Sequence, residues 1–404
     1  MELELDVTGI AHGGVGVARD ADGRVVFVAD AIPGERVRVV LTEAKKSYAR
    51  GIAVEVLEAS PDRVPHIWPE AGIERDPADR AGGAEFGHIA LPRQRELKAE
   101  VLRDALQRFA GIEREVAVQA APGDDEVGGL GWRTRVRLHI GADGRPGPYA
   151  ARSHCVVPVA GLPLAAAGID AVLAQTFPGE DAVDVIGTAD GVRLVIGRQA
   201  PSVIEEVVGD RTFRVDDTGF WQVHREAPAV LRAGVRDAID ADRFDPAARN
   251  LDLYGGVGLL ASALIDLGGS STRVETVESD ARASGHAAEN LADAPNVVAT
   301  VDRVDRWLRV GASSRPPGSL SDREFEGATI VLDPPRSGAG LEIADAITRL
   351  GAAQLVYVAC DPVALARDAK AIEANGYRLA RLTAFDLFPH THHIEAIATF
   401  LPDR

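Results

Sequence analysis

Cysteine is scarce in this chain of 404 residues, which contains only Cys155 and Cys360. Two thiols are too few for a disulfide framework or a four-thiolate metal site, a composition that fits a reducing compartment. Long apolar runs are missing as well, because no stretch approaches the roughly 18 consecutive apolar residues of a membrane span. The first residues, MELELDVTGI, are acidic where a secretory signal is basic. We therefore expect a cytoplasmic protein without a membrane segment.

Lysine is rare too, since four of the 44 basic residues are lysines, and 61 acidic residues bring the formal net charge to −17. An acidic chain is not expected to bind nucleic acid generally, because such binding surfaces are basic. Two segments depart from this average. One is the loop that contains Lys45, Lys46 and Arg50. The other, residues 130–155, has a local charge of +4 from Arg133, Arg135, Arg137, Arg145 and Arg152 against Asp143. Alternate side chains of a strand share a face, so these arginines predict a surface that contacts phosphates.

Apolar periodicity indicates a small β-barrel, a β-rich middle and an α/β domain. Residues 1–58 alternate apolar and polar side chains between glycine turns, as the strands of a small barrel do. A helix is expected near 92–110, and strand-like alternation returns at 130–215. From about residue 222, strands alternate with helices, which is typical of a parallel sheet. The expected strands are 250–254, 274–278, 328–333, 354–360, 378–388 and 393–401, of which the last two pair antiparallel.

A glycine loop, Asp252-Leu-Tyr-Gly-Gly-Val-Gly258, joins the first of these strands to a helix. Such a loop lets the backbone approach a ligand at the helix N-terminus, although a tight packing turn explains many of them. Glu278 ends the next strand, where an acidic side chain would bind ribose hydroxyls. The combination favours a nucleoside cofactor.

Three later motifs follow strands of the same domain. Asp333-Pro-Pro-Arg336 predicts a rigid loop at a carboxyl end, where α/β sheets bind ligands, although a stiff turn with a solvated Asp is the simpler interpretation. Cys360 precedes Asp361-Pro362, and a lone cysteine is more often a buried apolar residue. A helix N-terminus there would favour its thiolate, whereas Asp361 would oppose it. Glu395 follows a histidine cluster without metal-ligand spacing, and this carboxylate could accept a proton in a cleft.

In this order, GFWQVH, LDLYGGVG, Glu278, LDPPRSG, VYVACDP and FPHTHHIE resemble the S-adenosylmethionine-dependent RNA uracil-C5 methyltransferases. The resemblance spans nearly the whole chain, and its last motifs are the most specific. It implies an α/β fold in which a Rossmann-like methyltransferase domain (92–125 and 218–404) accompanies two others. These are an N-terminal OB-like TRAM barrel (1–60) and a central α+β domain with a basic face (61–91 and 126–217).

The resemblance also implies site residues. Cys360 would be the nucleophile that adds to C6 of uracil, and Glu395 the general base that removes the C5 proton. Contacts to S-adenosylmethionine would come from Gln222, Tyr254, Gly256, Glu278, Asp302 and Asp333. The RNA, with its uridine flipped out, would meet Lys45, Lys46, Arg50, Arg133, Arg135 and Arg137. We expect ribosomal RNA rather than transfer RNA as the substrate, and a monomer.

The chain departs from the family pattern at four places. The usual Cys-Gly-Gly-Cys is Ala81-Gly-Gly-Ala84, so no iron–sulfur cluster is expected. Asp361 stands where Asn is usual, Gly255 where Cys is frequent, and Leu259 where a polar residue often meets the cofactor. Two alternatives follow: a methyltransferase of this fold with another RNA base or substrate, and a non-catalytic RNA-binding protein. The presence of both proposed catalytic residues argues against the second.

Overall fold

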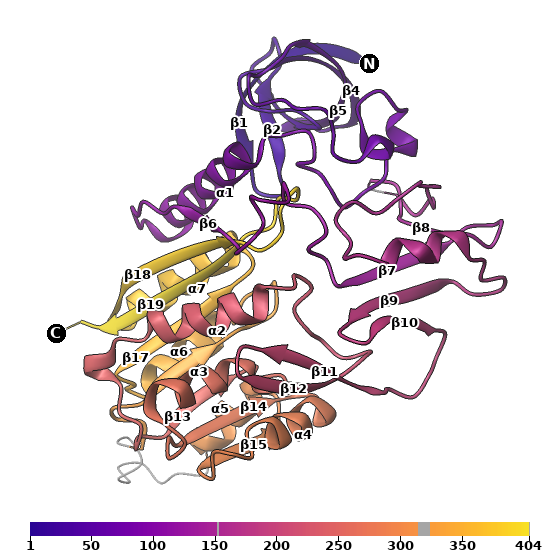
Figure 1. Ribbon diagram of the computed structural model, residues 1–404. Helices are drawn as coiled ribbons and strands as arrows, with labels where there is room; N and C mark the ends of the chain where they lie inside the picture. The colour runs from indigo at the N-terminus through magenta and orange to yellow at the C-terminus, as the bar shows by residue number, and fades with distance from the viewer. Residues whose placement is uncertain (152, 314–323, 404) are drawn as a thin grey trace. The chain divides into compact units, whose positions relative to one another are not determined.

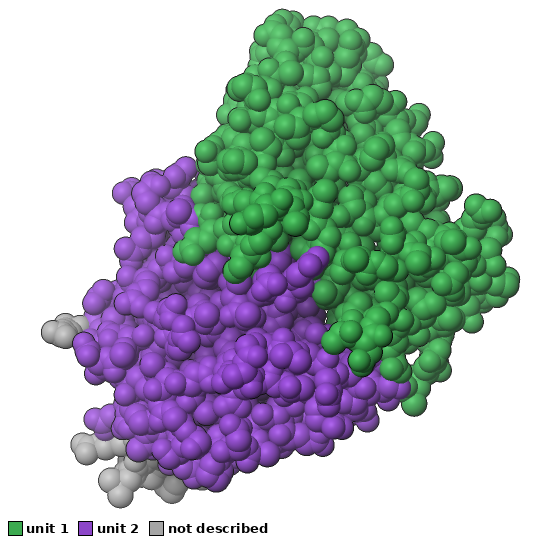
Figure 2. All heavy atoms as spheres, in the orientation of Figure 1, with its two compact units in different colours: residues 1–101, 118–200, 386–393 green, residues 102–117, 201–385, 394–404 purple. Residues whose placement is uncertain are grey.

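The computed structural model describes residues 1–151, 153–313 and 324–403 (Figure 1). The expected Arg152 lies outside the described residues. Contacts divide the chain into two compact units, coloured separately in Figure 2. Unit 1 consists of residues 1–101, 118–200 and 386–393, and unit 2 of residues 102–117, 201–385 and 394–404. Unit 1 thus contains both the barrel and the central part, and the division into three domains stays a prediction. In the described part of the chain, no helix is long and apolar enough to cross a bilayer.

The N-terminal strands of unit 1 form the expected barrel. They are β1 (Glu2–Ala11), β2 (Val15–Arg19), β3 (Val25–Ala29), β4 (Arg36–Ala44) and β5 (Tyr48–Glu58), closed in the order β1-β2-β3-β5-β4. Apolar and charged side chains alternate along β4. Val37 and Val39 are fully buried in the barrel core, while Arg36 and Arg38 point outward and pair with Glu4. Side chains therefore fill the barrel interior.

The central part of unit 1 is a small sheet with short helices. Its strands β7 (Arg135–Ile140), β8 (Pro146–Gly147), β9 (Ala182–Thr188) and β10 (Gly191–Ile196) lie in the order β10-β9-β7-β8. The same unit contains the short helices η1 (Pro69–Ala71), η2 (Pro77–Asp79) and η4 (Ile169–Ala174), and the short strand β6 (Val118–Ala120), which is not part of this sheet. Leu138, Ile169, Val183 and Val185 form a shared core. The expected helix appears as α1 (Leu91–Ala105), extended by the π-turn η3 (Leu106–Ala110).

The turn Ala81–Ala84 is held by the neighbouring Arg80, whose side chain is buried. Its guanidinium donates hydrogen bonds to the Asp30 carboxylate (2.7 Å) and the Ala53 carbonyl (2.9 Å) of the barrel, and to the Ile73 carbonyl (2.8 Å). The methyl groups of Ala81 and Ala84 are buried and cannot ligate iron. These residues do not fit a thiolate-bound cluster.

The segment 386–393 belongs to unit 1 and is fastened by buried polar contacts. Lys98 and Asp386, both without exposed side-chain surface, form an ion pair, and Lys98 Nζ also donates to the Phe388 carbonyl (3.0 Å). The Gln94 side chain accepts a hydrogen bond from the His390 amide (2.8 Å). One end of this segment leads directly to Ile394 and Glu395 of unit 2.

Unit 2 is built on a sheet whose seven strands have the order β15-β14-β13-β16-β17-β19-β18. These are β15 (Val297–Val301), β14 (Val274–Glu278), β13 (Asn250–Leu253), β16 (Thr329–Leu332), β17 (Gln354–Ala359), β19 (Glu395–Pro402) and β18 (Tyr377–Asp386). The first five are parallel, and β19 is antiparallel to both neighbours. Six of the seven lie where the sequence predicts strands, and β15 was not predicted.

Helices connect these strands in the manner of an α/β fold (Figure 1). They are α2 (Ala227–Ala238), α3 (Leu259–Gly268), α4 (Ala281–Asn290), α5 (Val304–Ser313), α6 (Leu341–Arg349) and α7 (Pro362–Ala374), with the short η5 (Ala241–Arg243). A hairpin of β11 (Val203–Val208) and β12 (Arg211–Asp216) precedes them. Helix α2 packs on α3, and α6 packs on α5 and α7.

Candidate active site

The carboxyl ends of the parallel strands bring the expected cofactor residues to one edge of the sheet. Leu253 at the end of β13 pairs with Val277 of β14 and with Leu332 of β16. The residues that follow these three in the chain, Tyr254, Glu278 and Asp333, therefore lie in one row. The Asp333 amide donates to the Leu253 carbonyl (3.3 Å), and the Asp302 amide to the Glu278 carbonyl (2.9 Å). Four of the six expected cofactor residues thus share this edge.

In the glycine loop, neighbouring atoms approach Gly255 too closely for a larger residue. A Cβ atom on Gly255 would lie 1.9 Å from Thr276 Oγ1 and 3.0 Å from Asp252 Oδ2. Tyr254 takes a left-handed conformation (φ 62°), which is unusual for a residue other than glycine. Beside it, Gly256 (φ 52°) has open space where a Cβ would be. The loop therefore leaves a bare stretch of backbone at the strand end.

Asp252 and Glu278 hold this loop with their carboxyl groups. Glu278 accepts hydrogen bonds from the Gly256 amide (3.1 Å) and the Asp280 amide (2.7 Å). Asp252 accepts one from the Ala261 amide (2.9 Å) in the first turn of α3. Burial, together with the charge of Asp333, raises the pKa of Asp252 to about 8. Asp252 is consequently neutral at pH 7 and acts as a structural group.

Asp302 and Gln222, two of the cofactor candidates, differ in their surroundings. Asp302 accepts hydrogen bonds from the Arg303 amide (2.7 Å) and from the Arg306 guanidinium, so its carboxylate is engaged within its own segment. Gln222 is half-buried in the connection between β12 and α2, and its contact with a cofactor stays a prediction. Two residues before it, Phe220 exposes 77% of its surface. No site role was predicted for this large aromatic side chain.

Strand register also places Cys360 beside Glu395. Ala359 of β17 pairs antiparallel with Ala396 of β19, so the residue after Ala359 lies opposite the residue before Ala396. Cys360 is half-buried, whereas Glu395 exposes only 4% of its surface. These two residues, 35 positions apart in the chain, are joined by sheet pairing at the end of β17, two strands from the glycine loop.

The electrostatics of this corner favour protonated acids. Burial and the neighbouring Asp333 raise the pKa of Glu395 well above its usual range, and burial raises the pKa of Asp333 to about 7. Burial, with the charges of Glu395 and Asp333, raises the pKa of the Cys360 thiol to about 12, although Arg336 acts in the opposite direction. The unliganded site therefore holds a thiol, and one positive charge placed among these groups would favour their ionised forms.

Asp361 caps the helix that begins after Cys360 and adds to the effects that raise the pKa of the thiol, of which burial is the largest. Its carboxylate caps α7 by accepting hydrogen bonds from the Val363 amide (3.0 Å) and the Ala364 amide (2.8 Å). The cap places a negative charge on the amides that could otherwise have stabilised a thiolate. The sequence expectation that Asp361 opposes the thiolate therefore agrees in direction with the raised pKa of Cys360, to which burial contributes most.

A pair of residues that the sequence analysis missed positions the loop after Asp333. Asp368 on α7 is buried and accepts hydrogen bonds from the Tyr357 hydroxyl (2.6 Å), the Ala339 amide (2.7 Å) and the Gly340 amide (3.2 Å). Tyr357 belongs to β17, so the pair ties the loop that carries Arg336 to the strand that leads to Cys360. An acidic residue on an otherwise apolar helix face was the available signal.

The residues present fit S-adenosylmethionine in their chemistry. Glu278 offers carboxylate oxygens for ribose hydroxyls, and Gly256 offers an open backbone. The acidic groups around Asp333 suit a sulfonium cation, because burial raises their pKa values and a positive charge beside them would stabilise their ionised forms. In the part of the chain that the structure describes, no cluster of His, Cys, Asp or Glu could hold a metal ion.

The expected RNA-binding residues lie in unit 1 and are partly neutralised. Lys45 forms an ion pair with Glu43 (2.8 Å), and Arg50 lies 3.5 Å from the same carboxylate. Lys46 is exposed. Arg137 pairs with Asp184 (3.2 Å) on the neighbouring strand β9. The basic face predicted from alternate arginines is therefore less positive than the sequence suggests.

The Arg133 and Arg135 side chains are half-buried, whereas the Arg137 side chain is exposed. Arg133 Nε donates to the Arg135 carbonyl (3.1 Å), and its guanidinium lies over the Trp132 ring. Both arginines thus take part in the packing of the central sheet, and their contact with RNA stays a prediction.

Comparison with known proteins matches the chain over its whole length. Residues 1–54 match the TRAM domain, and residues 317–401 match the tRNA (Uracil-5-)-methyltransferase family. An uncharacterized RNA methyltransferase of Streptomyces avermitilis is 38% identical over 99% of this chain and 98% of the relative. The 23S rRNA (uracil(1939)-C(5))-methyltransferase RlmD of Methylococcus capsulatus is 30% identical over 98% of this chain and 96% of its own length.

A solved structure agrees with the fold. The crystal structure of Pyrococcus abyssi tRNA (uracil-54, C5)-methyltransferase, in complex with S-adenosyl-L-homocysteine, matches with a TM-score of 0.70 at 20% identity. The match covers 98% of this chain and 99% of that one. The fold class and the family resemblance predicted from the sequence are thereby confirmed.

Proposed function

Because the chain belongs to the family of S-adenosylmethionine-dependent RNA uracil-C5 methyltransferases, we propose that Cys360 and Glu395 methylate C5 of a uridine in ribosomal RNA. The observation that carries this proposal is the register of β17 and β19, which sets the thiol beside a buried carboxyl group at the cofactor edge. The preference for ribosomal over transfer RNA is supported by the relative named for 23S rRNA and by the TRAM barrel. We also propose a cytoplasmic enzyme that acts as a monomer.

Nucleophilic catalysis by Cys360 answers the main difficulty of the reaction, since C5 of uracil is a poor nucleophile. When Sγ bonds to C6, the thiol passes its proton to water, and the electron pair of the C5–C6 double bond moves into an enolate. C5 can then accept a methyl group. S-adenosylmethionine supplies that electrophilic methyl group together with a positive charge. Glu395 next removes the C5 proton, the double bond re-forms, and Sγ leaves C6.

The buried acidic groups around Cys360 affect when its thiol can react. Before any cation is bound, the raised pKa values of Cys360 and Glu395 keep both groups protonated. A sulfonium next to Asp333 would lower all three pKa values, because it stabilises each anion. The thiol therefore becomes reactive only when the methyl donor is in place, and this protects it from idle reaction with RNA.

Fluorinated RNA tests the nucleophile directly. RNA with 5-fluorouridine at the target should form a covalent adduct with the wild type and S-adenosylmethionine, since C5 has no proton to lose. Cys360→Ala should form none, whereas Glu395→Gln should accumulate an adduct on ordinary RNA as well. Equal adduct yields for the wild type and Cys360→Ala would refute the assignment. S-adenosylhomocysteine binding by calorimetry verifies that each variant is folded.

The RNA class is tested by mass spectrometry of nucleosides. Ribosomal and transfer RNA are purified separately from a strain that lacks the gene and treated with the enzyme. We expect 5-methyluridine to increase in ribosomal RNA. Methylation of transfer RNA alone would favour the substrate class of the Pyrococcus abyssi protein, and methylation of neither would favour a different base or a non-catalytic RNA-binding role.

A further inference from the structure

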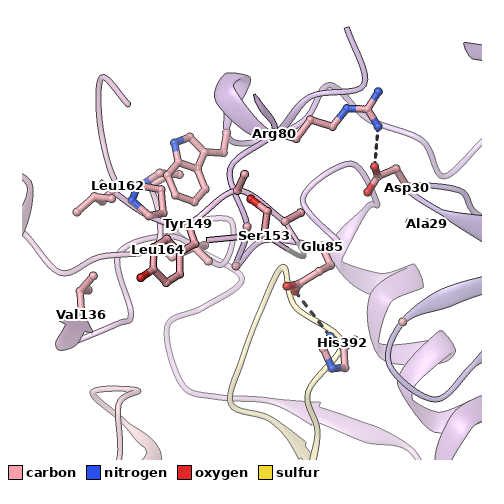
Figure 3. Close-up of a pocket in the computed structure, with 18 of the residues that line it drawn as sticks. Ala29, Asp30, Arg80, Glu85, Val136, Tyr149, Ser153, Leu162, Leu164 and His392 are labelled. Carbon is pink, nitrogen blue, oxygen red and sulfur yellow. Dashed lines mark hydrogen bonds and ion pairs between the residues drawn. The ribbon is translucent and has the colours of Figure 1, made fainter. Parts of the chain in front are cut away.

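Unit 1 contains a cavity of about 520 Å³ that the proposed reaction does not use (Figure 3). Its walls come from three places in the unit: Asp30 on the barrel, Arg80 and Glu85 in the connecting segment, and Val136 and Tyr149 in the central part. The volume lies within the roughly 300–1,000 Å³ of small-molecule pockets. One wall is rigid, because Arg80 is hydrogen-bonded to both Asp30 and the Ala53 carbonyl.

Aromatic rings line one side of this cavity. The rings of His139 and Tyr149 are stacked with centroids 3.5 Å apart and planes 8° apart, and His154 contacts Tyr149 edge-on. Burial and the neighbouring Arg137 lower the pKa of His139, which favours the neutral imidazole in this stacked pair. Figure 3 shows Tyr149 beside the apolar Leu162 and Leu164. Flat, neutral rings of this kind are platforms for stacked nucleobases.

Polar groups on the remaining walls match the edge of a base. The Glu85 carboxylate lies 3.7 Å from the His392 ring (Figure 3), and this neighbour holds the pKa of Glu85 at about 2, so the side chain remains an acceptor. Trp68 is 5% exposed, and its indole N–H has no hydrogen-bond partner among the described residues. A buried donor of this kind is normally satisfied. Gly13 and Gly83 add backbone with open space where a Cβ would be.

We propose that this cavity accepts one unstacked base of the RNA substrate, which stacks with Tyr149 and is hydrogen-bonded at its edge by Glu85 and Trp68. Arg133 and Arg137 also line the cavity, and the exposed Arg137, although paired with Asp184, adds positive charge for an adjoining phosphate. The inference rests on the proposed function only in taking RNA as the ligand. It gives unit 1 a specific holding role, separate from the uridine that reacts in unit 2.

A substitution that fills the cavity tests this role. Ala151 lines the cavity from an exposed position, so Ala151→Trp should block it without disturbing the core. The matched control is Ala189→Trp, in the exposed turn between β9 and β10 of the same unit. Binding of a fluorescein-labelled 12-nucleotide RNA of randomised sequence should weaken about 5-fold or more in Ala151→Trp, the loss of one stacked base, and stay unchanged in the control. Tyr149→Leu, which keeps the apolar bulk but removes the ring, should weaken binding similarly.

The outcomes separate this inference from the proposed reaction. Equal RNA affinity for Ala151→Trp and Ala189→Trp, or no binding of the RNA by the wild type, would overturn the cavity proposal. If Ala151→Trp loses folding, judged by circular dichroism, Tyr149→Leu decides in its place. Photocrosslinking of RNA with 4-thiouridine should label the peptide that contains Tyr149. The 5-fluorouridine adduct reports Cys360 independently, so RNA binding without an adduct refutes the chemistry and leaves the cavity in place.

Discussion

Gly255→Ala should disable the cofactor loop, because the new methyl group would occupy space that Thr276 already fills. The Cβ would lie 1.9 Å from Thr276 Oγ1, in a buried site where neither backbone can retreat freely. Overpacking of this kind costs about 1–3 kcal/mol, or roughly 2–10 °C in melting temperature. The shifted loop should also lose the hydrogen bond from the Gly256 amide to Glu278, which at about 1.5–3 kcal/mol weakens cofactor binding tenfold or more.

Removing the obstructing atom should rescue the variant. In Gly255→Ala with Thr276→Ala, the methyl group has room, so S-adenosylhomocysteine affinity by calorimetry and melting temperature should recover beyond additivity. Thr276→Val is the matched control, because it keeps an atom in the position of Oγ1 and should not rescue. If Gly255→Ala binds like the wild type, or if both double variants recover equally, the packing argument is wrong.

Three further predictions concern buried charge. Burial raises the pKa of Asp252 from 3.8 to about 8, so the folded protein favours the protonated form. The free energy of unfolding should therefore fall as pH rises from 5 to 8, on the order of 3 kcal/mol. In urea unfolding, Asp252→Asn should lack this decline, and an unchanged slope would contradict the prediction. The pKa of Asp333 near 7 predicts that affinity for S-adenosylmethionine, relative to neutral-sulfur S-adenosylhomocysteine, rises from pH 6 to 8, and a flat ratio in calorimetry would rule out Asp333 as the partner of the sulfonium. Lys98→Met should destabilise unit 1 by about 3–5 kcal/mol because Asp386 stays buried and charged, and Asp386→Leu in the same chain should restore melting temperature; a double variant as unstable as the single one would contradict this.

The parts of the site that follow strand ends could be predicted from the sequence. Tyr254, Glu278 and Asp333 each stand at the end of a strand that the sequence predicts, and parallel strands bring their carboxyl ends to one edge. Strand β15 was missed because, with Val298 and Val301 exposed at 57% and 51%, it lacks a buried apolar pattern.

Contacts between distant side chains could not be predicted in this way. The pairing of Cys360 with Glu395 came from family resemblance, because antiparallel register between two strands separated by a helix and a third strand has no local signal. Ion pairs across strands, such as Arg137 with Asp184, neutralise a basic pattern that looks continuous in one dimension. The fit of Gly255 against Thr276 likewise depends on two neighbouring strands meeting.

The hydrogen bonds of the Arg80 side chain hold unit 1 together in a way that resists oxidation. A guanidinium that donates to three carbonyls and a carboxylate joins these segments with no atom that oxygen or peroxide readily attacks. Folding of this region should therefore tolerate aerobic purification, oxidative stress in the cell, and growth with little iron.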